Sequence, residues 1–359
     1  MLLSKVQIAQ LRNLDTVTLD LSPSFNLFVG RNGAGKSSLL EAVAMLATGR
    51  SFRTSDMREV IRHGQSACHV YAEIDYNSAV RRYGLARMRS GGFEARVDGE
   101  AVRRLADALR LLPVQVISPE SLALLSSGRK ARCRFLDYGL FHVEQGFFEL
   151  WRRYDRLLQQ RNELLKRQAP DRELAPYALM LAEVAVPLTE MRASYLERLN
   201  QAVVVLAERV APGVKLQLKF EQGWPSAQPF SDALAERLPR DRQQGFPSIG
   251  PQRAGVSLSY NGRAADEVCS RGQMKLAVTC LKLAQGEDMA RALGQPILYL
   301  LDDIESELDR ERRGALLLWL RQQRLQVLAT AINEDAASAL LETGDTLFHV
   351  EHGAVHPKN

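Results

Sequence analysis

The strongest constraint on this chain is a short run near its start that fills the pattern G-x-x-x-x-G-K-[ST]. Chains with this pattern form a loop whose backbone N–H groups surround the phosphates of a bound nucleotide. The run consists of Gly30, Arg31, Asn32, Gly33, Ala34, Gly35, Lys36 and Ser37. We therefore predict a nucleoside triphosphate site formed by residues 30–37.

The residues on either side of this run support the prediction. Residues 25–29 are apolar and predict a short buried strand, and residues 38–46 carry apolar side chains at helical spacing up to Gly49. A helix that starts at the loop adds partial positive charge to its N–H groups. In this arrangement Lys36 reaches the β- and γ-phosphates, and the Ser37 hydroxyl is a ligand of Mg²⁺.

An acidic pair far along the chain predicts the other half of the site. Residues 297–301 form an apolar strand that ends in Asp302 and Asp303. At the carboxyl end of a strand beside the phosphate loop, Asp302 would hold Mg²⁺ and Asp303 could polarise the attacking water. Ser37 and Asp302 lie 265 positions apart, which predicts an inserted domain between them.

Pattern and composition predict an α/β fold in three stretches. Residues 1–115 contain alternating β segments at 5–11, 16–21, 67–76 and 84–89 and form the first part of the nucleotide-binding lobe. Residues 116–249 form a mainly helical second lobe, with amphipathic helices over 147–165 and over 177–210, the latter interrupted at Pro187. A strand at 214–220 and a surface connection over 223–250 complete that lobe, and residues 250–359 complete the nucleotide-binding part.

The composition excludes several classes of protein. The four cysteines form no C-x-x-C pair, so a zinc site or a disulfide framework is not expected. No apolar run is long enough to span a membrane, and we expect a cytoplasmic protein. The net charge of +5 is compatible with nucleic acid without requiring it. Two basic clusters are either solvated faces or phosphate contacts, and they consist of Arg81, Arg82, Arg87, Arg89 and Arg96, and of Arg129, Lys130, Arg132 and Arg134.

A second glycine motif precedes the acidic strand. The run Ser270-Arg271-Gly272-Gln273 starts a predicted helix and resembles the L-S-G-G-Q signature of ABC-type ATPases. Residues 306–309, with the sequence S-E-L-D, resemble the D-loop of the same proteins. This resemblance implies that Ser270, Gly272 and Gln273 face the γ-phosphate bound by a second subunit.

The whole chain resembles the RecF family of recombination mediators, which is related to the ATPase heads of SMC proteins. The resemblance rests on the motifs above and on runs such as G-R-S-F-R-T and S-R-G-Q-x-K-L, and it covers residues 11–14, 29–40, 49–54, 118–120, 134–137, 141–144, 160–165, 250–254, 270–276 and 301–309. It implies an ABC-type ATPase head with a mainly helical second lobe and no long coiled coil.

Several functional expectations follow from this resemblance. The family binds DNA at gaps and at junctions of single and double strands, including single-stranded DNA, and forms a homodimer on ATP. It hydrolyses ATP slowly, acting as a weak DNA-stimulated switch with Mg²⁺. It acts with RecO and RecR to load RecA in repair, replication restart and the SOS response. By position, residues 30–37 would bind ATP, Asp302 would hold Mg²⁺, and Asp303 would replace the usual catalytic glutamate.

Four positions depart from the ABC-type pattern. Cys269 replaces the usual leucine of the signature, and Asp303 is shorter than glutamate, which predicts slow hydrolysis. No histidine follows the strand at 326–331, where Thr330 alone offers a hydroxyl. Gln115 is better interpreted as a structural strand residue than as the glutamine that links the metal to the second lobe. Arg12 and Arg53, together with the two basic clusters, are our candidates for DNA contacts.

Two other interpretations remain open from the sequence. The same motifs could belong to the ATPase subunit of a membrane transporter, although the long spacing between them and the missing switch histidine disfavour it. A scaffold with a decayed nucleotide site is also conceivable, although Lys36, Ser37, Asp302 and Asp303 are all intact.

Overall fold

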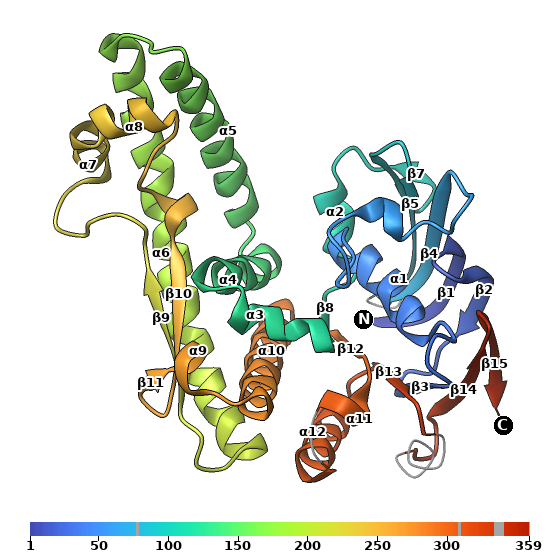
Figure 1. Ribbon diagram of the computed structural model, residues 1–359. Coiled ribbons are helices and arrows are strands. Elements are labelled where there is room, and N and C mark those ends of the chain that lie inside the picture. The colour runs from blue at the N-terminus through green and yellow to red at the C-terminus, as the bar shows by residue number, and fades with distance from the viewer. Residues whose placement is uncertain (77–78, 308–309, 334–340, 359) are drawn as a thin grey trace. The chain divides into compact units, whose positions relative to one another are not determined.

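The computed structural model describes residues 1–76, 79–307, 310–333 and 341–358 (Figure 1). Leu308 and Asp309 of the predicted D-loop lie outside the described residues. The chain divides into two compact units. Unit 1 comprises residues 1–122, 209–211 and 278–359, and unit 2 comprises residues 123–208 and 212–277.

One sheet of unit 1 is antiparallel. Its strand order is β2 (Leu14–Asp20), β1 (Leu2–Leu11), β4 (Ala67–Tyr76), β5 (Ala79–Met88), β6 (Phe93–Val97) and β7 (Glu100–Ala101). The alternation seen in the sequence sets the register, because Ile8 pairs with both Val17 and Val70 and all three side chains are buried. The opposite face of each strand carries polar residues, as expected for a sheet with one solvated side.

The second sheet of unit 1 carries the phosphate loop. Its order is β15 (Ala354–Lys358), β14 (Thr346–Glu351), β3 (Phe25–Val29), β13 (Val327–Ala331), β12 (Leu298–Leu301) and β8 (Val114–Ile117). All neighbours are parallel except β14 and β15. Strands β3, β12 and β13 are buried throughout, which explains their mainly apolar sequences, with Asn26 and Thr330 as buried polar residues. Helix α1 (Lys36–Thr48) packs against strands of both sheets in one hydrophobic core.

Short helical segments complete unit 1. They are η1 (Met57–Glu59), α2 (Leu105–Leu109), η2 (Pro119–Leu122), α11 (Ile304–Glu307), α12 (Arg310–Gln322) and the later part of α10 (Arg271–Leu293). Residues 118–120, one of the runs that carry the family resemblance, lie at the start of the 3₁₀ helix η2.

Unit 2 is mainly helical, as predicted. It contains α3 (Ala123–Ser126), α4 (Arg129–Val143), α5 (Phe147–Lys166), most of α6 (Asp171–Val210), α7 (Phe230–Glu236), α8 (Leu238–Gln244), η3 (Pro251–Arg253), α9 (Ala265–Val268) and the start of α10. A small antiparallel sheet has the order β11 (Arg263–Ala264), β10 (Gly255–Tyr260) and β9 (Leu216–Glu221).

Three predictions for unit 2 need correction. The chain returns to unit 1 at residue 278 rather than at 250, because β10 pairs with β9 and therefore belongs to the helical unit. The stretch 223–250 is not only a surface connection, since it forms α7 and α8, which bury Phe230, Leu234 and Asp241. Pro187 does not interrupt α6, which continues through it while the adjacent Leu188 is fully buried.

Helix α6 is long and apolar enough to span a membrane by length and composition alone. Its Leu181, Val184 and Leu188 are completely buried within the fold. Arg192 on the same helix is buried and makes a bidentate ion pair with the half-buried Asp137 of α4, at 2.8 and 2.7 Å. One face of α6 is therefore packed within the fold, while Leu179 and Val186 remain exposed.

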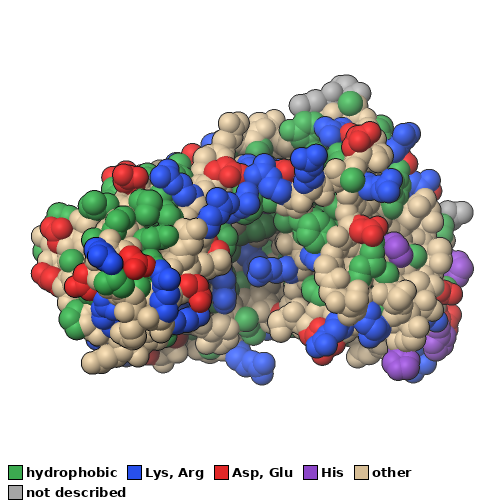
Figure 2. Space-filling view, turned by 90° about the horizontal axis from the view of Figure 1, so that it is seen from above, with side chains coloured by type: hydrophobic (Ala, Val, Ile, Leu, Met, Phe, Trp, Pro, Cys, Tyr) green, Lys and Arg blue, Asp and Glu red, His purple; other side chains and the backbone are tan. Residues whose placement is uncertain are grey.

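The charged surface is mixed rather than uniformly basic on the face seen in Figure 2. Lys and Arg side chains stand among Asp and Glu side chains on the visible face of each unit. A modest net charge distributed in this way favours solubility without creating a single strong field.

The pair of the buried Arg192 with Asp137 should contribute to the stability of unit 2. We expect Asp137→Asn to lower the free energy of unfolding by about 3–5 kcal/mol, because Arg192 would remain buried without its carboxylate. The matched control is Glu144→Gln, which breaks an exposed pair with Arg198 and should cost at most about 1 kcal/mol. Urea unfolding followed by circular dichroism measures both, and equal small losses would contradict the prediction.

Candidate functional site

The phosphate loop connects β3 to α1, and two of its glycines leave no room for a side chain. A Cβ at Gly30 would lie 2.2 Å from the carbonyl oxygen of Val350, and Gly35 has a φ of +119°. Among the described residues, no side chain caps the N-terminus of helix α1. Its first N–H groups therefore border a pocket that is lined by Asn32, Gly33 and Ser37 among others.

Lys36 lies inside this loop. Its ammonium donates hydrogen bonds to the carbonyl oxygens of Gly30 and Arg31, at 2.6 and 3.0 Å. Burial lowers the pKa of Lys36, and the nearby charge of Asp302 opposes that effect. The geometry thus holds a positive charge at the centre of a loop suited to anions.

Ser37 and Asp302, the two residues predicted as metal ligands, are in direct contact. The Ser37 hydroxyl donates a hydrogen bond of 2.8 Å to Asp302 Oδ1. The contact arises because β13 lies between β3 and β12 in a parallel sheet, so that the carboxyl ends of the three strands share one edge. Burial raises the pKa of Asp302, which is 5% exposed.

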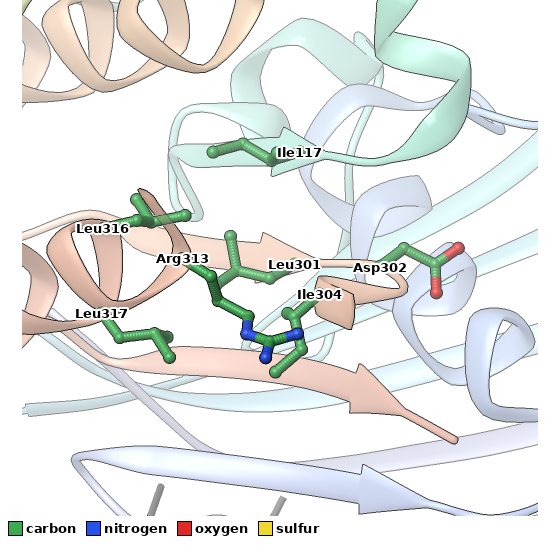
Figure 3. Close-up of a pocket in the computed structure, with 7 residues that line it drawn as sticks. All are labelled: Ile117, Leu301, Asp302, Ile304, Arg313, Leu316 and Leu317. Atoms are coloured by element: carbon green, nitrogen blue, oxygen red, sulfur yellow. The ribbon is translucent and has the colours of Figure 1, made fainter. Parts of the chain in front are cut away.

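Figure 3 shows how Asp302 is aimed. Its carboxylate points away from a small apolar pocket that lies under the strand end and is lined by Ile117, Leu301, Ile304, Leu316 and Leu317, with Arg313 beside them. These side chains come from β8, β12, α11 and α12. The apolar support fixes the end of β12 while the charged group faces the phosphate loop.

Asp303 lies next to Asp302 with its backbone in the left-handed region, at a φ of +54°. Its N–H donates a hydrogen bond of 2.8 Å to the hydroxyl of Thr330 on β13. Thr330, the one hydroxyl residue of the strand expected to present a switch histidine, thus contacts the acidic pair. Glu305, which sequence analysis did not single out, accepts hydrogen bonds from the N–H groups of Ile332 and Asn333 just beyond β13.

The signature motif forms the start of α10 in unit 2. The backbone N–H of Ser270 donates to Gln273 Oε1 at 2.8 Å, and the N–H of Gln273 donates to Ser270 Oγ at 3.3 Å. This reciprocal pair is a capping box, so Ser270 and Gln273 satisfy the helix end and each other. Gly272 is exposed, and a Cβ there would meet no atom.

Arg12 and Arg53, our candidates for DNA contacts, line the pocket beside the phosphate loop. Both contact Glu41, a fully buried residue of α1, with Arg12 bound bidentately at 3.0 and 2.8 Å and Arg53 at 3.5 Å. The bond to Glu41 raises the pKa of Arg12. Sequence analysis missed Glu41, although a charged residue inside the apolar stretch of α1 was a usable signal.

The basic clusters are partly structural. Arg87 donates to the carbonyl oxygen of Gly49, and Arg89 to those of Ile61, Arg62 and Gln65. In the second cluster Arg132 is buried against the carbonyl oxygens of Leu125 and Val256, and Arg129 pairs with Glu221. Arg89 and Arg129 are exposed despite these contacts, and the other exposed members are Arg82, Arg96, Lys130 and Arg134.

Gln115 is a structural residue of β8. It is 2% exposed and donates a hydrogen bond of 2.9 Å to Gln285 on α10. The side chain therefore joins the sheet to a helix of the same unit, in agreement with the interpretation that we favoured.

Comparisons with known proteins agree with this geometry. A family model described as "RecF/RecN/SMC N terminal domain" matches residues 2–356. Curated proteins named "DNA replication and repair protein RecF" from Vibrio campbellii and Vibrio cholerae are each 36% identical to this chain, over 354 and 361 residues, and the matches cover 98% of this chain and 99% of each relative.

Solved structures show the same relation. The structure of "the recombination mediator protein RecF-ATP in RecFOR pathway" matches with a TM-score of 0.90 and 25% identity, covering 100% of this chain and 98% of that one. An Smc head bound to the C-terminal winged-helix domain of ScpA matches with a TM-score of 0.60 and 14% identity, covering 100% of this chain and 97% of that one, which indicates a shared fold.

Because Arg53 lines the pocket beside the phosphate loop, its removal should weaken nucleotide binding more than DNA binding. We expect Arg53→Ala to weaken ATP binding by about tenfold, the loss expected for one hydrogen bond to a charged group. Titration with a fluorescent ATP analogue measures this effect. The control Arg82→Ala removes an exposed arginine of β5 and should leave ATP binding unchanged, and equal effects of the two variants would contradict the assignment.

Proposed function

The chain belongs to the RecF family, and from that membership we propose that it is an ATP-dependent DNA-binding protein of replication and recombinational repair. The observation that carries the proposal is the hydrogen bond between Ser37 and Asp302, which unites the two halves of a nucleotide site across 265 positions. The match over nearly the whole chain also disfavours the transporter interpretation, and the intact site disfavours a decayed scaffold.

ATP would bind in the phosphate loop. Residues 30–37 would surround its phosphates with N–H groups, and Lys36 would neutralise charge on the β- and γ-phosphates. The loop suits this role because its lining is polar and Lys36 is the cation at its centre. Arg12 and Arg53 add two further cations at the rim of the same pocket.

Mg²⁺ would be held by Ser37 and Asp302. Their oxygens are 2.8 Å apart, and hydroxyl and carboxylate oxygens are donors that suit this hard cation. The bound ion would neutralise charge on the phosphates. Asp303 would orient the attacking water, and its short side chain fits slow, DNA-stimulated hydrolysis that resets a switch.

A homodimer would complete the site. In this proposal Ser270, Gly272 and Gln273 of one subunit face the γ-phosphate bound by the other. The γ-phosphate then gives ATP a higher affinity for the dimer than for the monomer, which shifts the equilibrium toward the dimer. The cap of α10 uses Ser270 Oγ and Gln273 Oε1 as acceptors, so the Ser270 hydroxyl proton and the Gln273 Nε2 group can still donate to a phosphate.

DNA would bind mainly through its phosphates, in a way that depends on salt and little on sequence. The candidate contacts are now Arg82, Arg96, Lys130 and Arg134, four exposed members of the basic clusters, whereas the exposed Arg89 and Arg129 are engaged within the fold. With RecO and RecR as partners, the protein would act in the cytoplasm at gaps and junctions and help to load RecA, in replication restart and the SOS response.

The decisive test is the mass of the protein in solution, measured by light scattering with ATP, with and without a short gapped duplex. We expect ATP to produce a dimer that DNA strengthens. Lys36→Ala and Ser270→Arg should each weaken dimerisation at least about tenfold, since one removes a phosphate ligand and the other places a bulky charge in the signature.

Two control variants make the test specific. Lys130→Ala removes an exposed lysine, and Ser194→Arg adds an arginine on the exposed side of α6. Both should still form dimers on ATP. A wild-type protein that stays monomeric with ATP and ignores DNA would overturn the proposed function.

A further inference from the structure

We propose that Thr330 is a positioning residue that holds the two acidic residues of the site, Asp302 and Asp303, in working geometry. This inference rests on the proposed ATPase function and concerns how that reaction is arranged. Thr330 lines neither the phosphate pocket nor the apolar pocket under Asp302. Its effect on nucleotide chemistry must therefore pass through its acidic neighbours.

The Thr330 hydroxyl contacts both acidic residues at once. It donates a hydrogen bond of 2.7 Å to Asp302 Oδ1 and accepts one of 2.8 Å from the backbone N–H of Asp303. The single hydroxyl proton is thus donated to Asp302, and a lone pair of the hydroxyl oxygen accepts the N–H of Asp303. Serine is the only other side chain that would combine a hydroxyl donor and acceptor in so small a volume at this position.

Asp302 is oriented from two sides. Ser37 and Thr330 both donate to the same oxygen, Oδ1, from α1 and β13 respectively. The carboxylate cannot rotate without breaking both bonds. Since Ser37 and Asp302 are the residues that would hold Mg²⁺, Thr330 fixes the direction in which the acidic ligand is presented to the ion.

Asp303 depends on Thr330 in a different way. Its backbone has a φ of +54°, a conformation that aspartate tolerates but that remains uncommon for residues other than glycine. The hydrogen bond to Thr330 ties the N–H of this turn to β13. Loss of the bond would let the turn relax and would redirect the Asp303 side chain that is proposed to orient water.

The position of Thr330 is itself rigid. The residue is 1% exposed within β13, a strand buried throughout its length, and its β-branched side chain has restricted rotamers. Glu305 fastens the end of the same strand through the N–H groups of Ile332 and Asn333, at 2.8 and 3.1 Å. The hydroxyl is therefore held in place before any ligand arrives.

The test compares Thr330→Val, which keeps the shape and removes the hydroxyl, with Thr330→Ser, which keeps the hydroxyl. We expect the valine variant to lose about tenfold in kcat and to need several-fold more Mg²⁺ for half-maximal ATP binding. Binding of a fluorescent ATP analogue in EDTA should stay within about twofold of wild type, because the phosphate loop is untouched. The serine variant should retain most of the wild-type behaviour in all three measurements.

Controls separate positioning from packing. Thr189→Val changes a buried threonine of α6 whose hydroxyl has no hydrogen-bond partner among the described residues, and it should leave the Mg²⁺ dependence unchanged. If Thr330→Val does not accumulate as folded protein, Thr330→Ala makes the same comparison with Thr330→Ser.

Each outcome decides the inference. A valine variant with wild-type kcat and Mg²⁺ dependence, or a serine variant as impaired as the valine one, would overturn it. A loss of ATP binding in EDTA as large as the loss with Mg²⁺ would also overturn it, because that result indicates collapse of the whole site. A wild-type protein that neither binds ATP with Mg²⁺ nor hydrolyses it would instead defeat the proposed function itself.

Discussion

The hydrogen bond between Ser37 and Asp302 is the contact on which the rest of the site depends. It forms only because β13 lies between β3 and β12, so that three strands from distant parts of the chain end at one edge. The phosphate loop, the acidic pair and Thr330 are all brought together by this strand order. The contacts among these residues therefore depend on the order of the strands in the sheet as well as on the motifs.

The local motifs could be predicted because interactions between residues close in sequence form them. The loop at residues 30–37, helix α1 and the strand before Asp302 follow from glycine, apolar spacing and a terminal acid, and Gln115 is structural as favoured. The lobe boundary near 250 was misplaced because the pairing of β10 with β9 is non-local. The place of Arg12 and Arg53 beside the phosphate loop could not be predicted, because positive charge alone does not distinguish a phosphate of ATP from one of DNA.

The ion-pair partners of Glu41 could not be read from sequence patterns. A buried carboxylate is costly unless it is paired, and its partners come from the turn after β1 and from the loop after α1. The carboxylate thus joins the two segments that flank the phosphate pocket. The capping box at Ser270 and Gln273 makes a similar point, since one short pattern serves both as a helix start and as a signature motif.

The strand order also affects how the chain can fold during synthesis. Both neighbours of β3 in the sheet, β13 and β14, come from residues beyond 326. At ribosomal speeds of about 5–20 residues per second, β3 waits roughly 15–60 seconds for them to emerge. Throughout that interval an apolar strand with unpaired backbone groups is exposed while the helical unit is completed. The nascent chain therefore needs protection from aggregation for longer than a chain whose neighbouring strands are close in sequence.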